Sequence, residues 1–199
     1  MSTKSETSHH YETKHPGRHP EVMVLAGGGI DSTVLIAMYR KRNNTVTAIH
    51  YDYGHPAQTG ELRSLRRLSV KYDFKLLTRS IRARIARIDD EFLCRNALFI
   101  LSAAAEFGGR GQRLAIGAHS QAPYYDCSPE FFVLMRSLLD GHFGGRVTLE
   151  VPLQDFTKSD IVALGRKMRV PLSWTHSCTR ARTPCGKCPS CLDREALGV

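Results

Sequence analysis

Short apolar runs alternate along the chain with longer segments in which apolar residues recur at helical spacing. The first run covers residues 22–26 and ends in three glycines, after which a helical pattern passes through Leu35, Ile36, Met38 and Tyr39. A short apolar run bounded by turn residues predicts a buried strand, and the longer period predicts a helix. The whole pattern predicts strands at 22–26, 45–51, 75–78, 113–117 and 147–151, and further helices at 58–72, 96–107, 129–139 and 158–168.

This alternation predicts the fold class. Strands that alternate with helices indicate an α/β fold with a parallel sheet, helices on both faces and right-handed crossovers. Ligands of such sheets bind at the carboxyl ends of the strands. We therefore expect the glycine turn that follows residue 26, Asp52 and residues 117–119 to lie on one rim of the sheet.

The same pattern divides the chain into three parts. Residues 1–20 are rich in Ser, Thr, Lys and His without apolar periodicity, and they are predicted to form a flexible tail. The irregular spacing of the four histidines in this tail favours disorder over a metal site. Residues 21–170 are predicted to form one α/β domain, and residues 171–199 a C-terminal segment that holds four of the six cysteines.

Composition limits the class of protein. Of the 199 residues, 42% are hydrophobic and 24% are charged, as in ordinary globular proteins. The longest apolar-rich stretch, residues 97–107, is too short to span a bilayer and predicts a buried helix. The N-terminus has no apolar core that would serve as a secretory signal. We expect a cytoplasmic protein with no membrane partner.

The charge of the chain favours anionic ligands. The formal net charge is +9, and residues 1–20 contribute only +1 of it, from three basic and two acidic side chains, which leaves +8 on the folded part. Such a balance suits ATP and also RNA. A basic composition by itself is common in proteins that bind no nucleic acid, so both possibilities stay open.

The turn after the first predicted strand has the features of a phosphate site. Glycines let the backbone approach an anion, and the N–H groups at the start of a helix point toward it. The turn is neither a Walker A loop nor a Rossmann fingerprint. A carboxylate among such amides requires a cation such as Mg²⁺ beside the phosphates. The alternative is a tight turn in which Asp31 or Ser32 only caps the helix. The candidate residues are Ala26, Gly27, Gly28, Gly29, Ile30, Asp31, Ser32 and Thr33.

Four cysteines near the C-terminus have metal-ligand spacing. They are Cys178, Cys185, Cys188 and Cys191, in the pattern C-x6-C-x2-C-x2-C. Without a secretory signal this spacing indicates a metal site rather than disulfides, and it fits tetrahedral Zn²⁺. An iron–sulfur cluster is the alternative. Four thiolates leave no position for water, so a structural role is expected.

The glycine turn resembles the S-G-G-x-D-S signature of the PP-loop ATP pyrophosphatases. Members of that superfamily cleave ATP to AMP and pyrophosphate while they adenylate a substrate, and the resemblance implies an adenine nucleotide alpha hydrolase-like fold. Gly27 stands where the signature has serine. One hydroxyl donor is therefore lost while the backbone amides remain.

Further segments resemble one family of this superfamily, the 7-cyano-7-deazaguanine synthases of the queuosine pathway. Residues 52–54 match its F-D-Y-G, and 95–99 resemble its G-R-N-x-x-F. Residues 125–127, with Phe131 after them, resemble its Y-P-D-C-R-x-x-F, and 152–158 its P-L-x-x-x-x-K. The four cysteines correspond to its zinc site. The matches run in order from about residue 22 to 194.

One stretch departs from the family pattern. Residues 79–94 are shorter than the family's substrate-side loop and rich in arginine, and Cys94 stands where the family has glycine. The part that would close over the substrate has therefore changed more than the ATP half.

The resemblance implies an ATP-dependent ligase that uses ATP, Mg²⁺ and Zn²⁺. It would adenylate the carboxylate of 7-carboxy-7-deazaguanine and use ammonia to form the nitrile. The implied catalytic residues are Asp31, Ser32, Lys158 and Arg95, and Asp52 joins the 26–33 turn in binding the nucleotide. The implied substrate contacts are Tyr53, Arg95, Asn96, Tyr125, Asp126 and Phe131.

Several of these residues have plainer interpretations. Lys158 would be a solvated side chain at a helix start, although the helix dipole disfavours a cation there. Arg95 would pair with Asp89 or Asp90. Asp126 would serve as a loop hydrogen bond or a cap. Two residues outside the implied set are also open: His119 as a base or a structural histidine, and Cys127 as an inert thiol.

Three functions are weighed on this basis. The first is the nitrile-forming ligase, expected as a homodimer. The second is a related adenylating ligase that joins a deazaguanine carboxylate to a protein or RNA acceptor, which the altered 79–94 segment would admit. The third is a zinc- and RNA-binding module without catalysis, suggested by Gly27 and the positive charge.

Overall fold

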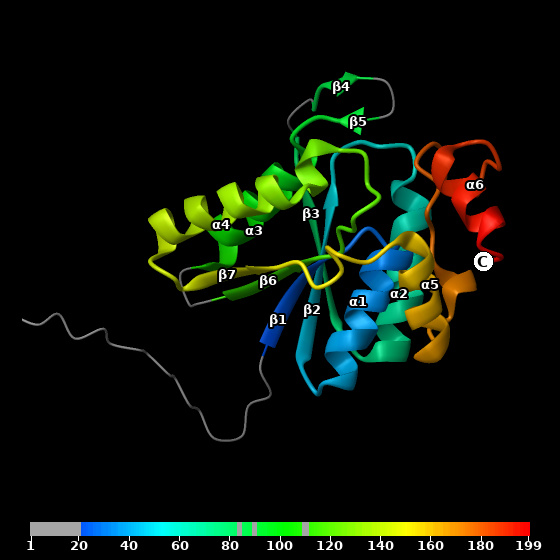
Figure 1. The fold of residues 1–199 in the computed structure, drawn as a ribbon, viewed down its shortest axis with the longest axis horizontal. Helices are drawn as coiled ribbons and strands as arrows, with labels where there is room; N and C mark the ends of the chain where they lie inside the picture. Colours follow the sequence, from blue (N-terminus) through cyan, green and yellow to red (C-terminus); the bar gives the residue numbers. More distant parts are fainter. Residues whose placement is uncertain (1–20, 83–84, 89–90, 109–111) are drawn as a thin grey trace, which may run out of the picture.

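The computed structural model describes residues 21–82, 85–88, 91–108 and 112–199. The predicted tail at 1–20, with its histidines, lies outside these residues, as do Asp89 and Asp90, the suggested partners of Arg95. The chain forms a five-stranded parallel sheet in the order β3-β2-β1-β6-β7, which confirms the predicted α/β fold (Figure 1). The strands are β1 (Glu21–Leu25), β2 (Thr45–Asp52), β3 (Lys75–Ser80), β6 (Gln112–Ile116) and β7 (Val147–Glu150).

Helices cover both faces of this sheet, as expected (Figure 1). Along β1, Val22 and Val24 face one core and Met23 and Leu25 face the other. Strands buried on both faces read as continuous apolar runs, which is why 22–26 was recognisable. One face carries α1 (Ile30–Lys41), α2 (Gln58–Tyr72) and α5 (Lys158–Lys167), and the other carries α3 (Arg95–Phe107) and α4 (Pro129–Phe143).

The strand order reverses its direction between β1 and β6. From β1 the chain proceeds outward through β2 to β3, and then returns to place β6 on the opposite side of β1, with Met23 opposite Leu114 in the register. A reversal of this kind opens a crevice beyond the carboxyl ends of the two strands. The glycine turn follows β1 and Gly117 follows β6, so both lie at the crevice.

Capping residues set several helix boundaries. The side chain of Thr157 accepts a hydrogen bond from the Asp160 backbone N–H, and the Asp160 side chain accepts one from the backbone N–H of Thr157, which fixes the start of α5. Helix α4 runs past the predicted residue 139 to Phe143, and Gly144 ends it with a φ of 56°.

The structure contains short elements that the periodicity did not predict. The pair β4 (Arg87–Ile88) and β5 (Glu91–Phe92) forms a two-stranded antiparallel sheet within the 79–94 segment. The single turns η2 (Tyr125–Cys127) and η3 (Leu172–Trp174) and the helix α6 (Pro189–Ala196) are the others. Each has eight residues or fewer, too few for an apolar period to emerge.

The C-terminal segment lies against the α/β domain beside α2 and α5 (Figure 1). The backbone N–H of His176 donates to the Gly28 carbonyl at 2.9 Å, and Arg166 on α5 donates to the carbonyl of Leu197 at 2.7 Å. Whether residues 171–199 are a separate unit stays a prediction. Within the described ranges, no helix has the length and apolarity needed to cross a membrane.

Candidate functional site

A cavity of about 460 Å³ opens at the carboxyl ends of β1, β2 and β6. The β1–α1 turn, the loop after β2, the start of α3, the loop after β6 and the C-terminal segment all contribute to its wall. This is the rim where the sequence placed the ligand site. The predicted residues that line it are Ala26, Gly27, Gly29, Ile30, Asp31, Ser32, Tyr53, Arg95, Asn96, Asp126 and Lys158.

The glycine turn leaves the start of α1 open to the cavity. Gly29 is the N-cap of α1, and no side chain caps the helix. The hydroxyls of Ser32 and Thr33 donate to the Gly29 carbonyl instead, at 3.3 and 2.7 Å. The alternative in which Asp31 or Ser32 caps the helix is therefore wrong, and the first backbone N–H groups of α1 remain available to an anion.

Gly28 is required by the shape of this turn. Its φ is +71°, and a Cβ there would lie 2.7 Å from the Glu61 carbonyl oxygen. The Gly28 carbonyl accepts from the Ser64 hydroxyl at 2.8 Å and from the His176 N–H at 2.9 Å. Hydrogen bonds from α2 and from the C-terminal segment therefore both fix the position of the turn. Gly28 itself does not line the cavity.

Asp31 and Lys158 form an ion pair on the wall of the cavity. The Lys158 Nζ lies 2.6 Å from Asp31 Oδ1 and 2.7 Å from Oδ2, with the two side chains 20% and 24% exposed. Lys158 begins α5, and its backbone N–H donates to Gln121 Oε1 at 2.8 Å. The interpretation of Lys158 as a solvated side chain is wrong, because its ammonium group lies against the carboxylate of the glycine turn.

Asp126 joins η2 to the start of α3. Its Oδ2 accepts from the Asn96 backbone N–H at 3.0 Å, and the Asn96 side-chain amide donates to its carbonyl oxygen at 3.0 Å. Asp126 is only 6% exposed. This is the loop hydrogen bond that the sequence left open as an alternative, yet Asp126 and Asn96 both line the cavity as well.

Arg95 keeps its charge in the same wall. Burial works to lower the pKa of the guanidinium, but nearby Tyr53 and Asp126 outweigh it, and the pKa is raised above its ordinary value. A fixed positive charge therefore faces the cavity next to the buried Asp126 carboxylate.

Aromatic side chains form part of the cavity wall. Tyr51 stacks on Phe99 with ring centroids 4.9 Å apart. Tyr53 contacts Phe99 at 5.5 Å and meets Phe92 edge-on at 5.1 Å. Phe92 belongs to β5, so the changed 79–94 segment takes part in the cavity. A planar ring fits such a wall by stacking.

Five of the residues predicted to bind nucleotide or substrate do not line the cavity: Gly28, Thr33, Asp52, Tyr125 and Phe131. The Tyr125 side chain is 62% exposed and contacts Phe131 edge-on. Asp52 accepts from the Gly54 N–H at 3.0 Å, which closes the turn after β2. The nucleotide and substrate contacts assigned to these residues stay predictions.

The sequence reasoning missed a buried titratable cluster in the cavity wall, formed by His50, His55 and Glu61. Burial raises the pKa of the Glu61 carboxyl to about 8, although the charge of Arg95 counteracts this. Burial also lowers the pKa of His50, and it lowers the pKa of His55 to about 4 with a contribution from His50. The available signal was the position of His50 and His55 near the carboxyl end of β2, while Glu61 lies on α2.

His119 lines the cavity as well. Burial lowers the pKa of its ring, and its Nδ1 accepts from the Gln121 N–H at 3.3 Å. From the C-terminal segment, His176, Asp193 and Arg194 complete the wall. Their contribution depends on the fold of a segment whose secondary structure was not predicted.

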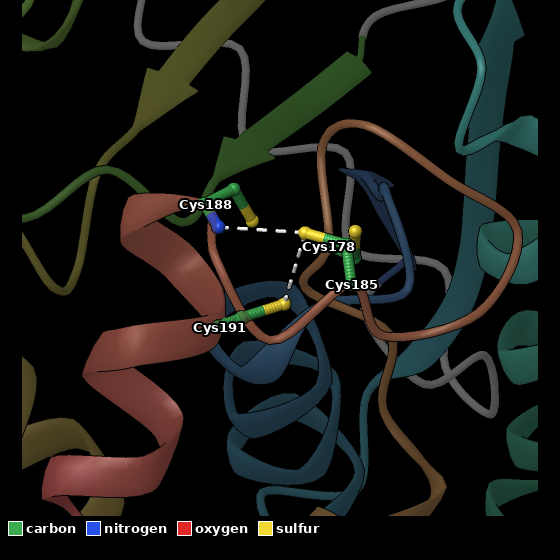
Figure 2. Close-up of side chains that lie close together, drawn as sticks. All are labelled: Cys178, Cys185, Cys188 and Cys191. Carbon is green, nitrogen blue, oxygen red and sulfur yellow. Dashed lines mark hydrogen bonds between the residues drawn. The ribbon is translucent and has the colours of Figure 1, made fainter.

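The four C-terminal cysteines gather at one point, with their Sγ atoms within 4.8 Å of one another (Figure 2). All four are free thiols, and Cys185 Sγ lies 4.0 Å from Cys191 Sγ. Ligands at about 2.3 Å from a tetrahedral Zn²⁺ are roughly 3.8 Å apart. The N–H groups of Lys187 and Cys188 lower the pKa of Cys185 to about 6, which favours the thiolate. The arrangement fits a four-thiolate zinc site.

Comparison with known proteins gives a consistent result. The family model described as queuosine biosynthesis protein QueC matches residues 21–94 and 86–197. The 7-cyano-7-deazaguanine synthase of Picrophilus torridus is 32% identical over 85% of this chain and 83% of its own. That of Aquifex aeolicus is 28% identical over 89% and 96%. A predicted tRNA methyltransferase subunit from Methanocaldococcus jannaschii shares the fold, with a TM-score of 0.55, 15% identity, and coverage of 74% of this chain and 76% of that one.

Proposed function

The chain belongs to the queuosine biosynthesis protein QueC family, and on this basis we propose that it converts 7-carboxy-7-deazaguanine and ammonia into 7-cyano-7-deazaguanine with cleavage of ATP. It is an ATP-dependent ligase. The cavity at the switch point of the sheet offers an open helix start for phosphates and an aromatic wall for a fused ring. One pocket therefore suits both substrates side by side.

The overall chemistry requires two activations. A carboxylate oxygen attacks the α-phosphorus of ATP, pyrophosphate leaves, and ammonia then displaces AMP to give the amide. The amide oxygen is adenylated by a second ATP, and loss of AMP and a proton leaves the nitrile. Both carboxylate oxygens depart on AMP, so the product contains the ammonia nitrogen and neither oxygen.

The Asp31–Lys158 pair is the observation that carries the proposal. A carboxylate beside the open amides of α1 is compatible with a triphosphate when a divalent cation lies between them, and Asp31 would hold that Mg²⁺, which neutralises phosphate charge. With Asp31 engaged in this way, the Lys158 ammonium group would be available to the phosphates. Catalysis of this kind consists of positioning and charge neutralisation.

The other half of the cavity suits the deazapurine. Its ring stacks among Tyr51, Tyr53 and Phe99, and its carboxylate is attracted to Arg95. Asp126, whose Oδ2 is occupied by Asn96, offers its other oxygen to the N–H groups of a guanine-type edge. Arg95 and the glycine turn line the same cavity, which supports transfer of the adenylyl group between neighbouring ligands.

Charge-removing variants test this assignment. Asp31→Asn and Lys158→Met each lose a charge-assisted contact of about 1.5–3 kcal/mol, which corresponds to a roughly 10–100-fold fall in pyrophosphate release. Asp73→Asn and Lys167→Met are matched controls, because both residues are exposed and neither lines the cavity. If all four variants release pyrophosphate at the wild-type rate, the assignment is wrong.

A further inference from the structure

His50, His55 and Glu61 form a compact cluster beside the glycine turn. One ligand atom from each residue lies within 4.8 Å of the others. Glu61 Oε2 is 3.4 Å from His55 Nε2 and 3.7 Å from His50 Nδ1. The histidine side chains are each 2% exposed and that of Glu61 is 20% exposed. The cluster is separate from the four cysteines and from the Asp31–Lys158 pair.

The cluster is incomplete as a hydrogen-bonded network. The Nε2 atoms of His50 and His55 are buried and have no hydrogen-bond partner among the described residues. The distances to Glu61 Oε2 exceed the range of about 2.7–3.2 Å found for N–H···O hydrogen bonds. Buried polar atoms are nearly always partnered, so the orphaned His55 Nε2, 3.4 Å from a carboxylate oxygen, indicates a missing ligand.

The spacing fits a metal ion better than a direct contact. Ligand atoms at about 2.0–2.1 Å from a tetrahedral ion are roughly 3.3 Å apart, close to the 3.4 and 3.7 Å observed. Two imidazoles and a carboxylate are a known donor set for Zn²⁺ with one open position. The His50 atom at 3.7 Å is Nδ1, which also lies 3.1 Å from the Ala26 carbonyl oxygen, so an ion bound by Nδ1 would take the place of that contact.

The open side of the cluster faces the glycine turn. A Cβ built on Gly27 would lie 3.6 Å from Glu61 Oε2, so the absence of a side chain at position 27 leaves space directly over the carboxylate. Gly27 and the three residues of the cluster all line the cavity. An ion held here would present its free position to whatever oxygen occupies the turn.

We propose that His50, His55 and Glu61 bind a divalent transition-metal ion of the Zn²⁺ class, with its open coordination position directed past Gly27 into the cavity. Metal binding at this site does not depend on the proposed function. Only its use does: in the ligase the open position would accept a phosphate oxygen of ATP.

Metal counting on the full-length chain tests the proposal. After equilibration with Zn²⁺ and removal of excess metal, His55→Gln and Glu61→Gln are expected to retain one equivalent less than the wild type. His142→Gln, an exposed histidine on α4, is the matched control and should lose none. Equal zinc content in the wild type and both cluster variants would overturn the proposal.

Cobalt spectroscopy on the wild type gives an answer that does not depend on any variant folding. Co²⁺ bound to four thiolates shows intense sulfur-to-metal charge transfer in the near ultraviolet, whereas Co²⁺ bound to nitrogen and oxygen shows only weak visible bands. In the wild type, one equivalent of Zn²⁺ fills the tighter four-thiolate site, so Co²⁺ added afterwards and retained should show the weak bands without charge transfer. Zinc-loaded wild type that retains no Co²⁺ with weak visible bands would contradict the proposal, whatever the ligase activity.

Discussion

Gly27 and Gly28 are neighbours in the sequence with opposite tolerance for a side chain. A Cβ on Gly27 would make ordinary contacts, 3.6 Å or more from Glu61, and its φ is not positive. A Cβ on Gly28 would be 2.7 Å from a backbone oxygen at a φ of +71°. The backbone therefore allows a side chain at position 27, whereas at position 28 it allows only glycine.

Restoring serine at position 27 should accelerate the reaction. The variant Gly27→Ser adds a hydroxyl donor at the phosphate turn, and a hydrogen bond to a charged group contributes about 1.5–3 kcal/mol. We expect pyrophosphate release to rise roughly ten-fold or more. Gly28→Ser is the control, and it should lose nucleotide binding. An unchanged or slower rate for Gly27→Ser would mean that the hydroxyl has no use in this chain.

The two cysteines outside the cluster should differ in reactivity. Burial raises the pKa of Cys127 to about 12, with a contribution from Asp126, so at pH 8 only about one thiol in 10⁴ is ionised. Cys94 is exposed. Iodoacetamide treatment of zinc-loaded protein at pH 8, followed by peptide mass spectrometry, should modify Cys94 and spare Cys127.

The pH dependence of labelling provides the check. Below its pKa, the thiolate fraction of Cys127 rises ten-fold for each unit of pH, so its slow modification should accelerate by that factor between pH 8 and 9. Labelling of Cys127 as fast as Cys94 at pH 8 would show that the thiol is not held in its neutral form.

At the scale of elements, the predictable parts are those with a long apolar period. Strand β1 and helix α2 were found within a residue or two because burial imposes a pattern on the sequence. The β4–β5 pair has two residues in each strand, and α6 starts at Pro189 directly after a cysteine ligand. Their structure depends on tertiary contacts and on the cysteine cluster, and neither of these imposes a repeating pattern of apolar residues on the sequence.

The site was predictable to a similar degree. Asp31 and Lys158, which line the cavity, were named from the sequence because each belongs to a motif with chemical meaning. The cluster of His50, His55 and Glu61 was missed because its members come from the end of β2, a loop and the first turn of α2, and only the packing of α2 on the sheet brings them together.

The C-terminal segment should be needed for nucleotide binding as well as for stability. Arg194 on α6 donates to Thr175 and Ser177, and His176 donates to Gly28, so α6 and the turn are connected. Cys191→Ser removes one thiolate from the predicted zinc site. A loss of only about 3 kcal/mol from this site would lower the Tm by roughly 6–12 °C.

Calorimetry measures both effects on one sample. For Cys191→Ser we expect a lower Tm and weaker ATP binding, and for Cys94→Ser, which lies outside the cluster, neither change. A Cys191→Ser protein with wild-type Tm and ATP affinity would separate the cysteine cluster from the cavity.

At the scale of the molecule, the strand order explains why all of these parts meet. The reversal between β1 and β6 opens the crevice, and α2, α3, α5 and the C-terminal segment each send side chains to it. The positive charge of the chain, +9 overall, suits two anionic substrates. Membership of the QueC family and this geometry agree on a ligase that activates a carboxylate with ATP.

The most direct measurement is pyrophosphate release by the full-length protein with ATP, 7-carboxy-7-deazaguanine and ammonia, with the product identified by mass. The account predicts release only when the deazapurine is present, amide and nitrile formation only when ammonia is also present, and two pyrophosphates for each 7-cyano-7-deazaguanine. ATP turnover that ignores the deazapurine, or no turnover with all three substrates, would contradict it.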